Sequence, residues 1–306
     1  MGHPTMFEVP MALDHAQLYK PEKKLRKLLK KISTEPTPEE VHELRTNIRR
    51  MEALLKALQL DSIGNEKKLL RAVNPVRRQA GKVRDMDVLT GFASSLHAGE
   101  EADCRVSLLE YLGVKRYRQA RKLGKLVRAE KRSVRWRLKR CVAHLDKMIG
   151  DGKQPDIDAR ATTEAAATSL RLASELRDPP RLNAGNLHEY RKKVKELRYV
   201  LKFAKNSDGD LVNVLGEVKD AIGEWHDWLE LESAANKVLD HGPGCGLMHE
   251  IRAIARDKFE HALSLTNRMR ARYVAGDGNR KGRRKQKPGK ARVTQPVLAA
   301  TSRIAA

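Results

Sequence analysis

Apolar residues recur at the three- and four-residue spacing of an α-helix from Asp14 to about Ala275, and no stretch alternates convincingly with the period of a β-strand. Leu, Ala, Arg, Lys and Glu, which favour helices, dominate this region. The pattern predicts an all-α protein with a linker at 150–158. The expected helices cover residues 14–32, 38–60, 65–80, 85–98, 102–149, 159–177, 184–206, 210–222, 225–240 and 246–274.

The positive charge is unevenly distributed along the chain. Lys and Arg number 62 and Asp and Glu 39, a net charge of +23. Residues 1–150 carry +15, residues 151–275 are neutral, and residues 276–306 carry +8. This excess predicts a polyanionic partner. Residues 276–306 lack an apolar stripe and are expected to form a disordered basic tail, either a second contact for the polyanion or a solubility tail only.

The expected helix 102–149 carries the densest positive charge. From Lys115 to Arg140, 13 of 26 residues are basic and only Glu130 is acidic. Like charges one turn apart destabilise a helix, so this stripe is expected to meet an anion, although a solvated basic face is the alternative. The stripe residues expected to bind the anion are Arg118, Arg121, Lys122, Lys125 and Arg128.

Two strings repeat in the same order in each half of the chain. VHELRTNIRRMEALLKA (41–57) matches LHEYRKKVKELRYVLKF (187–203), and GKVRDMDVL (81–89) matches GEWHDWLEL (223–231). This order predicts two similar helical units. The first match places His42 on His188, Arg45 on Arg191, and Arg49 on Lys195.

On a helix, the His, Arg and Lys residues of each repeat share one face, with about 5 Å between successive rungs. We call these two rows the ladders, and the first contains His42, Arg45 and Arg49. Each histidine could instead be a partly buried residue with a local hydrogen bond, but the repetition favours a shared anion-binding role. The second ladder contains His188, Arg191, Lys195, Arg198 and Lys202, with Lys192 beside it. A third string, HEIRAIAR (249–256), repeats the spacing with His249, Arg252 and Arg256.

These strings together resemble the CHAD family, the conserved histidine α-helical domain, over about residues 14–275. The resemblance implies two helical bundles related by pseudo-two-fold symmetry, about 14–150 and 159–275. It also implies binding of inorganic polyphosphate and association with polyphosphate granules. The positions implicated are His42, Arg45, Arg49, Arg50 and Arg84, then His188, Arg191, Lys192, Lys195 and Arg198. The halves are not equivalent throughout, since His226 replaces Arg84 and Glu196 replaces Arg50.

Polyphosphate is a chain of phosphates without bases, so rows of Arg and Lys donors on rigid helices suit it. Proteins that bind single-stranded nucleic acid usually add aromatic platforms, and this chain has only 13 Phe, Trp and Tyr residues. Trp225 and Trp228 are expected in the core, and Trp136 could pack against a neighbour. Nucleic acid is therefore the less favoured partner, and a regulatory partner of a polyphosphate enzyme is a further alternative.

No sequence motif indicates catalysis. The chain has no phosphate-binding glycine loop, nucleophile elbow or metal-binding Cys/His spacing, so no catalytic residue, metal or cofactor is expected. Cys104, Cys141 and Cys245 are scattered and are expected to be buried thiols in a reducing compartment. No run of about 18 apolar residues predicts a membrane span. We therefore expect a cytoplasmic protein at polyphosphate granules, and the oligomeric state stays open.

Overall fold

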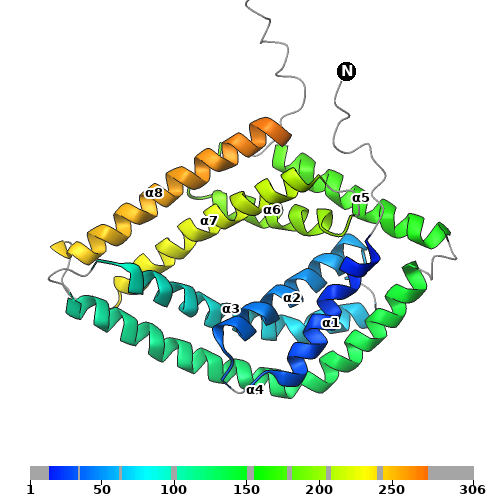
Figure 1. Ribbon diagram of the computed structural model, residues 1–306, viewed down its shortest axis with the longest axis horizontal. Helices are drawn as coiled ribbons and strands as arrows, with labels where there is room; N and C mark the ends of the chain where they lie inside the picture. The colour runs from blue at the N-terminus through cyan, green and yellow to red at the C-terminus, as the bar shows by residue number, and fades with distance from the viewer. Residues whose placement is uncertain are drawn as a thin grey trace, which may run out of the picture. The chain divides into compact units, whose positions relative to one another are not determined.

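Eight α-helices and a closing π-helical turn make up the regular structure that the computed structural model describes (Figure 1). It describes residues 14–33, 35–61, 64–97, 102–149, 155–177, 181–204, 208–239 and 244–274, which contain no β-strand. The all-α prediction is confirmed, and the predicted tail at 276–306 lies outside the described residues. The elements are α1 (His15–Lys31), α2 (Pro38–Ala57), α3 (Gly64–Ser95), α4 (Ala102–Ile149), α5 (Pro155–Arg177), α6 (Leu187–Leu201), α7 (Gly209–Ala235), α8 (Gly246–Met269) and the π turn η3 (Arg270–Val274).

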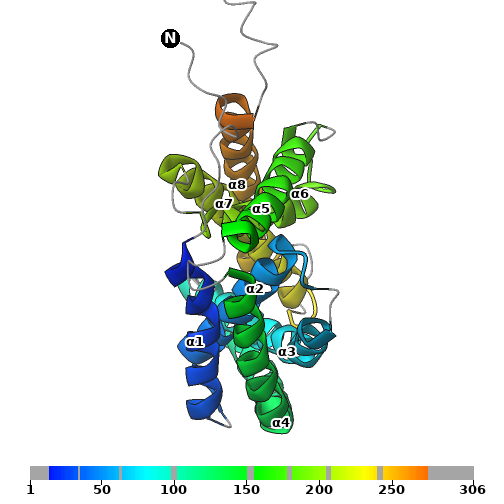
Figure 2. The same ribbon diagram turned by 90° about the vertical axis from the view of Figure 1, so that its right-hand side faces the viewer.

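The helices pack in two chain-ordered groups (Figures 1 and 2). In the first group each helix from α1 to α4 packs on the next, and α1 also packs on α4. In the second, each helix from α5 to α8 packs on the next, and η3 packs on α5. Across the groups, α2 packs on α6 and α3 on α7, so the helices that carry the repeated strings meet. The pseudo-two-fold symmetry and the bundle boundaries remain predictions.

The hydrophobic core is shared by the two groups of helices. A larger cluster of buried side chains draws on all eight helices. A smaller cluster joins the end of α3 and the start of α4 to the end of α7 and the start of α8. Cys104, Cys141 and Cys245 are buried within these clusters, as the sequence predicts. Because both clusters cross between the groups, apolar burial holds the ladder helices α2 and α6 in place.

Two helix breaks expected from the sequence do not occur. The expected helices 65–80 and 85–98 are one helix, α3, and the expected helices 210–222 and 225–240 are one helix, α7. Gly81 and Gly223 lie inside these helices, and an arginine of another helix packs over each of them. A Cβ added to Gly81 would lie 3.7 Å from Nε of Arg45, and one added to Gly223 would lie 2.9 Å from Cζ of Arg191.

The remaining differences concern helix ends. Helix α2 stops at Ala57, three residues early, and Gln59 beyond it has a φ of 52° that no continuing helix allows. Helix α5 begins at Pro155, inside the expected linker, and proline is favoured at a first helical position. Helix α6 is shorter than expected at both ends, because turns cover 184–186 and 202–203.

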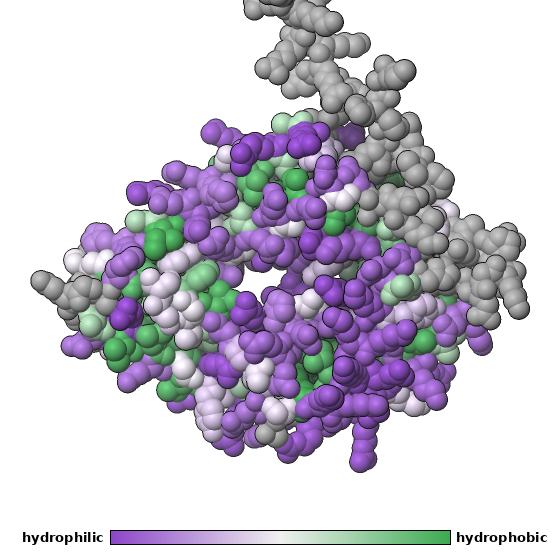
Figure 3. Space-filling model, in the orientation of Figure 1, coloured by the Kyte–Doolittle hydropathy of each residue, from purple (hydrophilic) through white to green (hydrophobic). Residues whose placement is uncertain are grey.

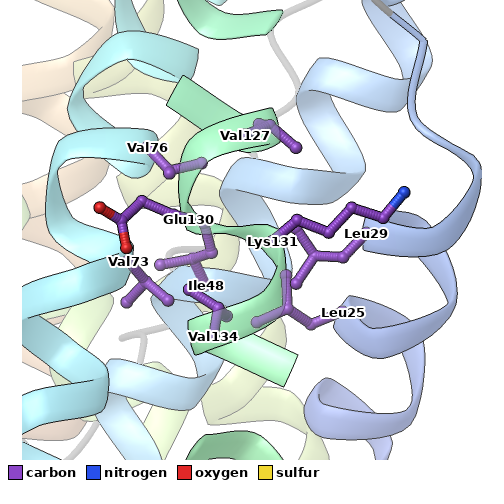
Figure 4. Close-up of a pocket in the computed structure, with 9 residues that line it drawn as sticks. All are labelled: Leu25, Leu29, Ile48, Val73, Val76, Val127, Glu130, Lys131 and Val134. Carbon is purple, nitrogen blue, oxygen red and sulfur yellow. The ribbon is translucent and has the colours of Figure 1, made fainter. Parts of the chain in front are cut away.

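A small gap lies in the apolar core between α1, α2, α3 and α4 (Figure 4). Valine, leucine and isoleucine side chains form most of its wall, with Glu130 and Lys131 at its edge. Its volume is about 10 Å³, at the lower limit of what one water molecule needs. The gap is a packing imperfection and offers no room for a ligand.

Candidate polyanion-binding site

Helix α2 is fixed so that its ladder faces the junction with α6. A capping box begins the helix: Thr37 Oγ1 accepts from the Glu40 amide, and Glu40 accepts from the Thr37 amide. Leu44, Met51 and Leu55, the apolar positions off the ladder face, are at most 1% exposed. Their burial sets the rotation of the helix about its axis and leaves the ladder face towards its neighbours.

Four partly buried cations from two helices gather at this junction. We call Arg45 and Arg49 of α2 and Arg191 and Lys195 of α6 the central cluster. Burial, followed by repulsion from Arg45, lowers the pKa of Arg49 to about 10. Burial, followed by repulsion from Arg49 and Arg191, lowers the pKa of Lys195 to about 7. The structure therefore brings together the central rungs of both predicted ladders.

Acidic side chains lie near the central cluster: Asp85 and Asp227 attract Arg45, and Glu52 attracts Arg49 and Lys195. Asp85 is exposed as a residue, yet desolvation by the surrounding helices raises the pKa of its carboxyl, and Arg45 opposes this rise. Glu52 is held by Arg77, whose Nε lies 2.8 Å from its carboxylate. The Nε atoms of Arg45 and Arg49 are buried and have no acceptor among the described residues. The cluster has the donors and the charge to bind an anion.

Two arginines of α6 are anchored on the backbone of α7. Nε of Arg191 donates to the Lys219 carbonyl at 3.0 Å, and Nε of Arg198 donates to the Val212 carbonyl at 3.0 Å. A glycine stands four residues beyond each of these carbonyls, Gly223 and Gly216 respectively. A Cβ at Gly216 would lie 2.9 Å from Nε of Arg198. Each glycine therefore leaves the space in which a guanidinium reaches a helical carbonyl.

Histidines stand at the edge of the central cluster. The ring of His188 lies 4.5 Å from that of His226, centroid to centroid. Burial and the charge of His226 lower the pKa of His188, whereas a hydrogen bond that the His226 ring donates to the Asp227 carboxylate raises the pKa of His226. Burial and repulsion from Arg84 lower the pKa of His42. His42 and His188 are thus kept neutral, in a form that donates one hydrogen bond from each ring.

His226 is a site residue that the ladder pattern alone missed. The sequence shows it only as a departure from the Arg-Asp pattern, because its contact with His188 joins α6 to α7. Asp227 beside it and Asp85 in α3 lie in helix interiors, so neither caps a helix. Both attract Arg45 electrostatically.

Arg50 and Lys202 line a separate pocket of about 280 Å³ between α1, α2 and the end of α6. Burial, followed by repulsion from Arg198 and Arg50, lowers the pKa of Lys202. Lys20 adds a third cation from α1, which the sequence analysis did not identify. Gln17, Pro21, Tyr199 and Phe203 complete the lining.

Other predicted site residues lie away from the central cluster. His249, Arg252 and Arg256 are exposed on α8, which packs on α7, and Nε of Arg252 lies 2.9 Å from the Glu232 carboxylate. Lys192 is exposed and paired with Glu189. The α4 stripe is also exposed, on the side away from the core. Its members are Arg118, Arg121, Lys122, Lys125 and Arg128.

Figure 3 shows an opening in the surface, bordered mainly by hydrophilic side chains, where α2 and α3 face α6 and α7. Among the residues the structure describes, no three His, Cys, Asp or Glu side chains converge as a metal site requires. None of the described helices has the length and apolar character of a membrane span. The described site is thus an open, cationic junction between helices.

Comparison with protein families matches most of the chain to one of them. A family model, the CHAD domain, matches residues 18–235, and the chain belongs to the CHAD family. This domain is associated with polyphosphate binding in general. A search of curated proteins finds no match to the chain.

Replacing Gly223 by Ala should weaken anion binding at the central cluster with little loss of stability. The new Cβ would displace the Arg191 guanidinium from the Lys219 carbonyl. The lost hydrogen bond and the better helix propensity of Ala are each worth about 1 kcal/mol and roughly offset. Thermal unfolding and binding titrations would measure both effects. Gly91→Ala, where no atom lies within 4 Å of the added Cβ, is the control and should bind normally.

Replacing Lys195 by Met should stabilise the free protein at pH 6. The folded pKa of about 7 is below the ordinary 10.5, so the unfolded chain binds more protons between these values. The contribution of this group to stability therefore rises as pH rises from 7 to 10.5 and is lowest below 7. The Tm advantage of the variant should be largest at pH 6 and shrink towards pH 10. Equal Tm values of the wild type and the variant at pH 6 would show that the charge of Lys195 does not destabilise the folded protein.

Proposed function

We propose that the chain binds inorganic polyphosphate non-catalytically at the junction of α2, α3, α6 and α7. The central cluster of Arg45, Arg49, Arg191 and Lys195 carries this proposal. Burial and mutual repulsion lower the pKa values of Arg49 and Lys195, so holding these charges together destabilises the free protein. A polyanion that binds the folded state supplies opposite charge and stabilises it.

The arrangement of donors suits a phosphate chain. Guanidinium groups make bidentate contacts with phosphate oxygens, and an ammonium group acts as a mobile point charge. Helices α2 and α6 hold both kinds of donor before the ligand arrives, which lowers the ordering cost of binding. Arg50 and Lys202 extend the cationic surface towards α1. Neutral His42 and His188 add hydrogen-bond donors at the edge.

Replacing all four central residues by Ala should reduce polyphosphate affinity about a hundredfold or more, because each lost charged contact is worth more than 1 kcal/mol. The helices should persist, since Ala favours them. Titration of polyphosphate at fixed salt, with circular dichroism of each variant, would test this. The control replaces Lys67, Lys68, Arg71 and Arg78, four exposed cations of α3, by Ala. Equal losses in both variants would show that net charge, rather than the cluster, binds the ligand.

Polyphosphate affinity should rise severalfold as pH falls from about 8.5 to 6.5. The pKa of Lys195 is about 7 in the free protein, and a bound anion favours its charged form, so binding takes up a proton above pH 7. Lys195→Arg should bind tightly across the whole range, and Lys195→Met should flatten the dependence. Titrations over pH with all three proteins would measure this. A wild-type profile unchanged in Lys195→Met would exclude a role for this amine.

We propose further that the protein acts in the cytoplasm at polyphosphate granules. A fluorescent fusion of the full chain should concentrate on granules, and the four-residue Ala variant should be diffuse. Steady release of phosphate from polyphosphate with Mg²⁺ would contradict a purely binding role. The competing polyanion is nucleic acid, so each titration is repeated with an oligonucleotide at equal phosphate concentration.

A further inference from the structure

The outer face of α4 is a second cationic surface. Leu123, Val127 and Leu138 are buried against the core and turn the opposite face of the helix to solvent. Six exposed cations follow one another there over 14 residues, a distance of about 21 Å along the axis. These are the α4 stripe, Arg118, Arg121, Lys122, Lys125 and Arg128, together with Arg132.

Two exposed aromatic side chains bracket these cations. Tyr117 is 50% exposed and Trp136 is 53% exposed, whereas Trp225 and Trp228 are at most 5% exposed in the core. From the sequence Trp136 could pack against a neighbour, but in the structure half of its surface is exposed to water. Arginines accompany both rings: Cζ of Arg140 lies 4.9 Å from the Trp136 ring and Cζ of Arg121 lies 5.7 Å from the Tyr117 ring.

Exposed rings beside cations favour a ligand that has both phosphates and flat faces. Polyphosphate has no apolar face, so a half-exposed indole gains nothing from it. A duplex keeps the flat faces of its bases stacked inside, where exposed rings of a helix cannot stack on them. Single-stranded nucleic acid offers a phosphate backbone together with bases that stack on aromatic rings and Arg planes. The two rings are 19 residues apart, about 28 Å along α4, which is the length of several nucleotides.

We propose that the outer face of α4 binds single-stranded nucleic acid. Tyr117 and Trp136 stack on bases, and the α4 stripe with Arg132 contacts the phosphates between them. From Arg118 to Arg140 the sequence has one acidic residue, Glu130, so little repulsion opposes the backbone. This surface is separate from the central cluster, and the proposal goes beyond polyphosphate binding.

Fluorescence gives a direct test, because Trp136 is exposed while the other two tryptophans are buried. An oligothymidine of about 15 nucleotides should quench the full-length protein saturably, since a stacked base contacts the indole. An abasic oligonucleotide of the same length should bind more weakly and quench little. Polyphosphate at equal phosphate concentration should also quench little, because its proposed site is the central cluster and not Trp136. Quenching should be lost in Trp136→Phe. Equal quenching by the abasic chain would overturn the stacking role.

Measurements of binding affinity distinguish the contribution of the aromatic rings from that of the positive charges. Tyr117→Ala with Trp136→Ala should weaken oligothymidine binding roughly tenfold to a hundredfold, whereas Tyr117→Phe with Trp136→Phe, which keeps the rings, should retain most of it. Replacing Arg121, Lys125 and Arg128 by Ala should make the slope of log affinity against log salt concentration shallower by about two. If the Tyr117→Ala, Trp136→Ala variant bound oligothymidine as tightly as the wild type, the outer face of α4 would bind phosphates alone and the proposal would fail.

A final arm separates this proposal from the proposed function. The four-residue Ala variant of the central cluster should keep oligothymidine binding and lose polyphosphate binding. The Tyr117→Ala, Trp136→Ala variant should show the reverse. Loss of oligothymidine binding in the cluster variant would place the nucleic acid at the central cluster and overturn the α4 site, whatever happens to polyphosphate.

Discussion

The crossing of α6 over α7 is the contact on which the site depends. Two arginines of α6 rest on glycines of α7 and donate to helical carbonyls, so side chain and backbone fix each other. This contact sets the rotation and height of α6 relative to α7. Because Lys195 lies one turn from Arg191, the same contact places Lys195 beside α2 and its arginines. The arrangement of the cationic junction therefore depends on the absence of side chains at Gly216 and Gly223.

A like-charge cluster of this kind destabilises the fold unless burial elsewhere compensates. The two hydrophobic clusters supply that compensation and cross between the groups of helices rather than staying within one. Separating the groups to relieve the repulsion would expose apolar side chains of both, at about 25 cal/mol for each Å². The shared core therefore holds the cations together in the absence of a ligand, which is what a preformed anion site requires.

The sequence predicted most of the helices and the residues at the centre of both ladders, because apolar periodicity and internal repeats can be read from the sequence alone. It failed where a residue's role depends on another helix. Gly81 and Gly223 look like helix breaks until an arginine from outside packs on them. Arg252 has the ladder spacing, and its ion pair with Glu232 of α7 is visible only in the structure. The exposure of Trp136 also depends on which helices stand beside α4, and periodicity along α4 does not contain that information.

The two halves contribute to the junction in different ways. In the second half, Arg191 and Arg198 have their Nε atoms bound to carbonyls, which makes α6 a fixed support. In the first half, Arg45 lies over Gly81 without such a bond, and the buried Nε atoms of Arg45 and Arg49 have no acceptor among the described residues. A bound phosphate gains most from donors that are otherwise unsatisfied. We therefore infer that α2 supplies more of the binding energy and α6 more of the geometry, although both carry the same repeat.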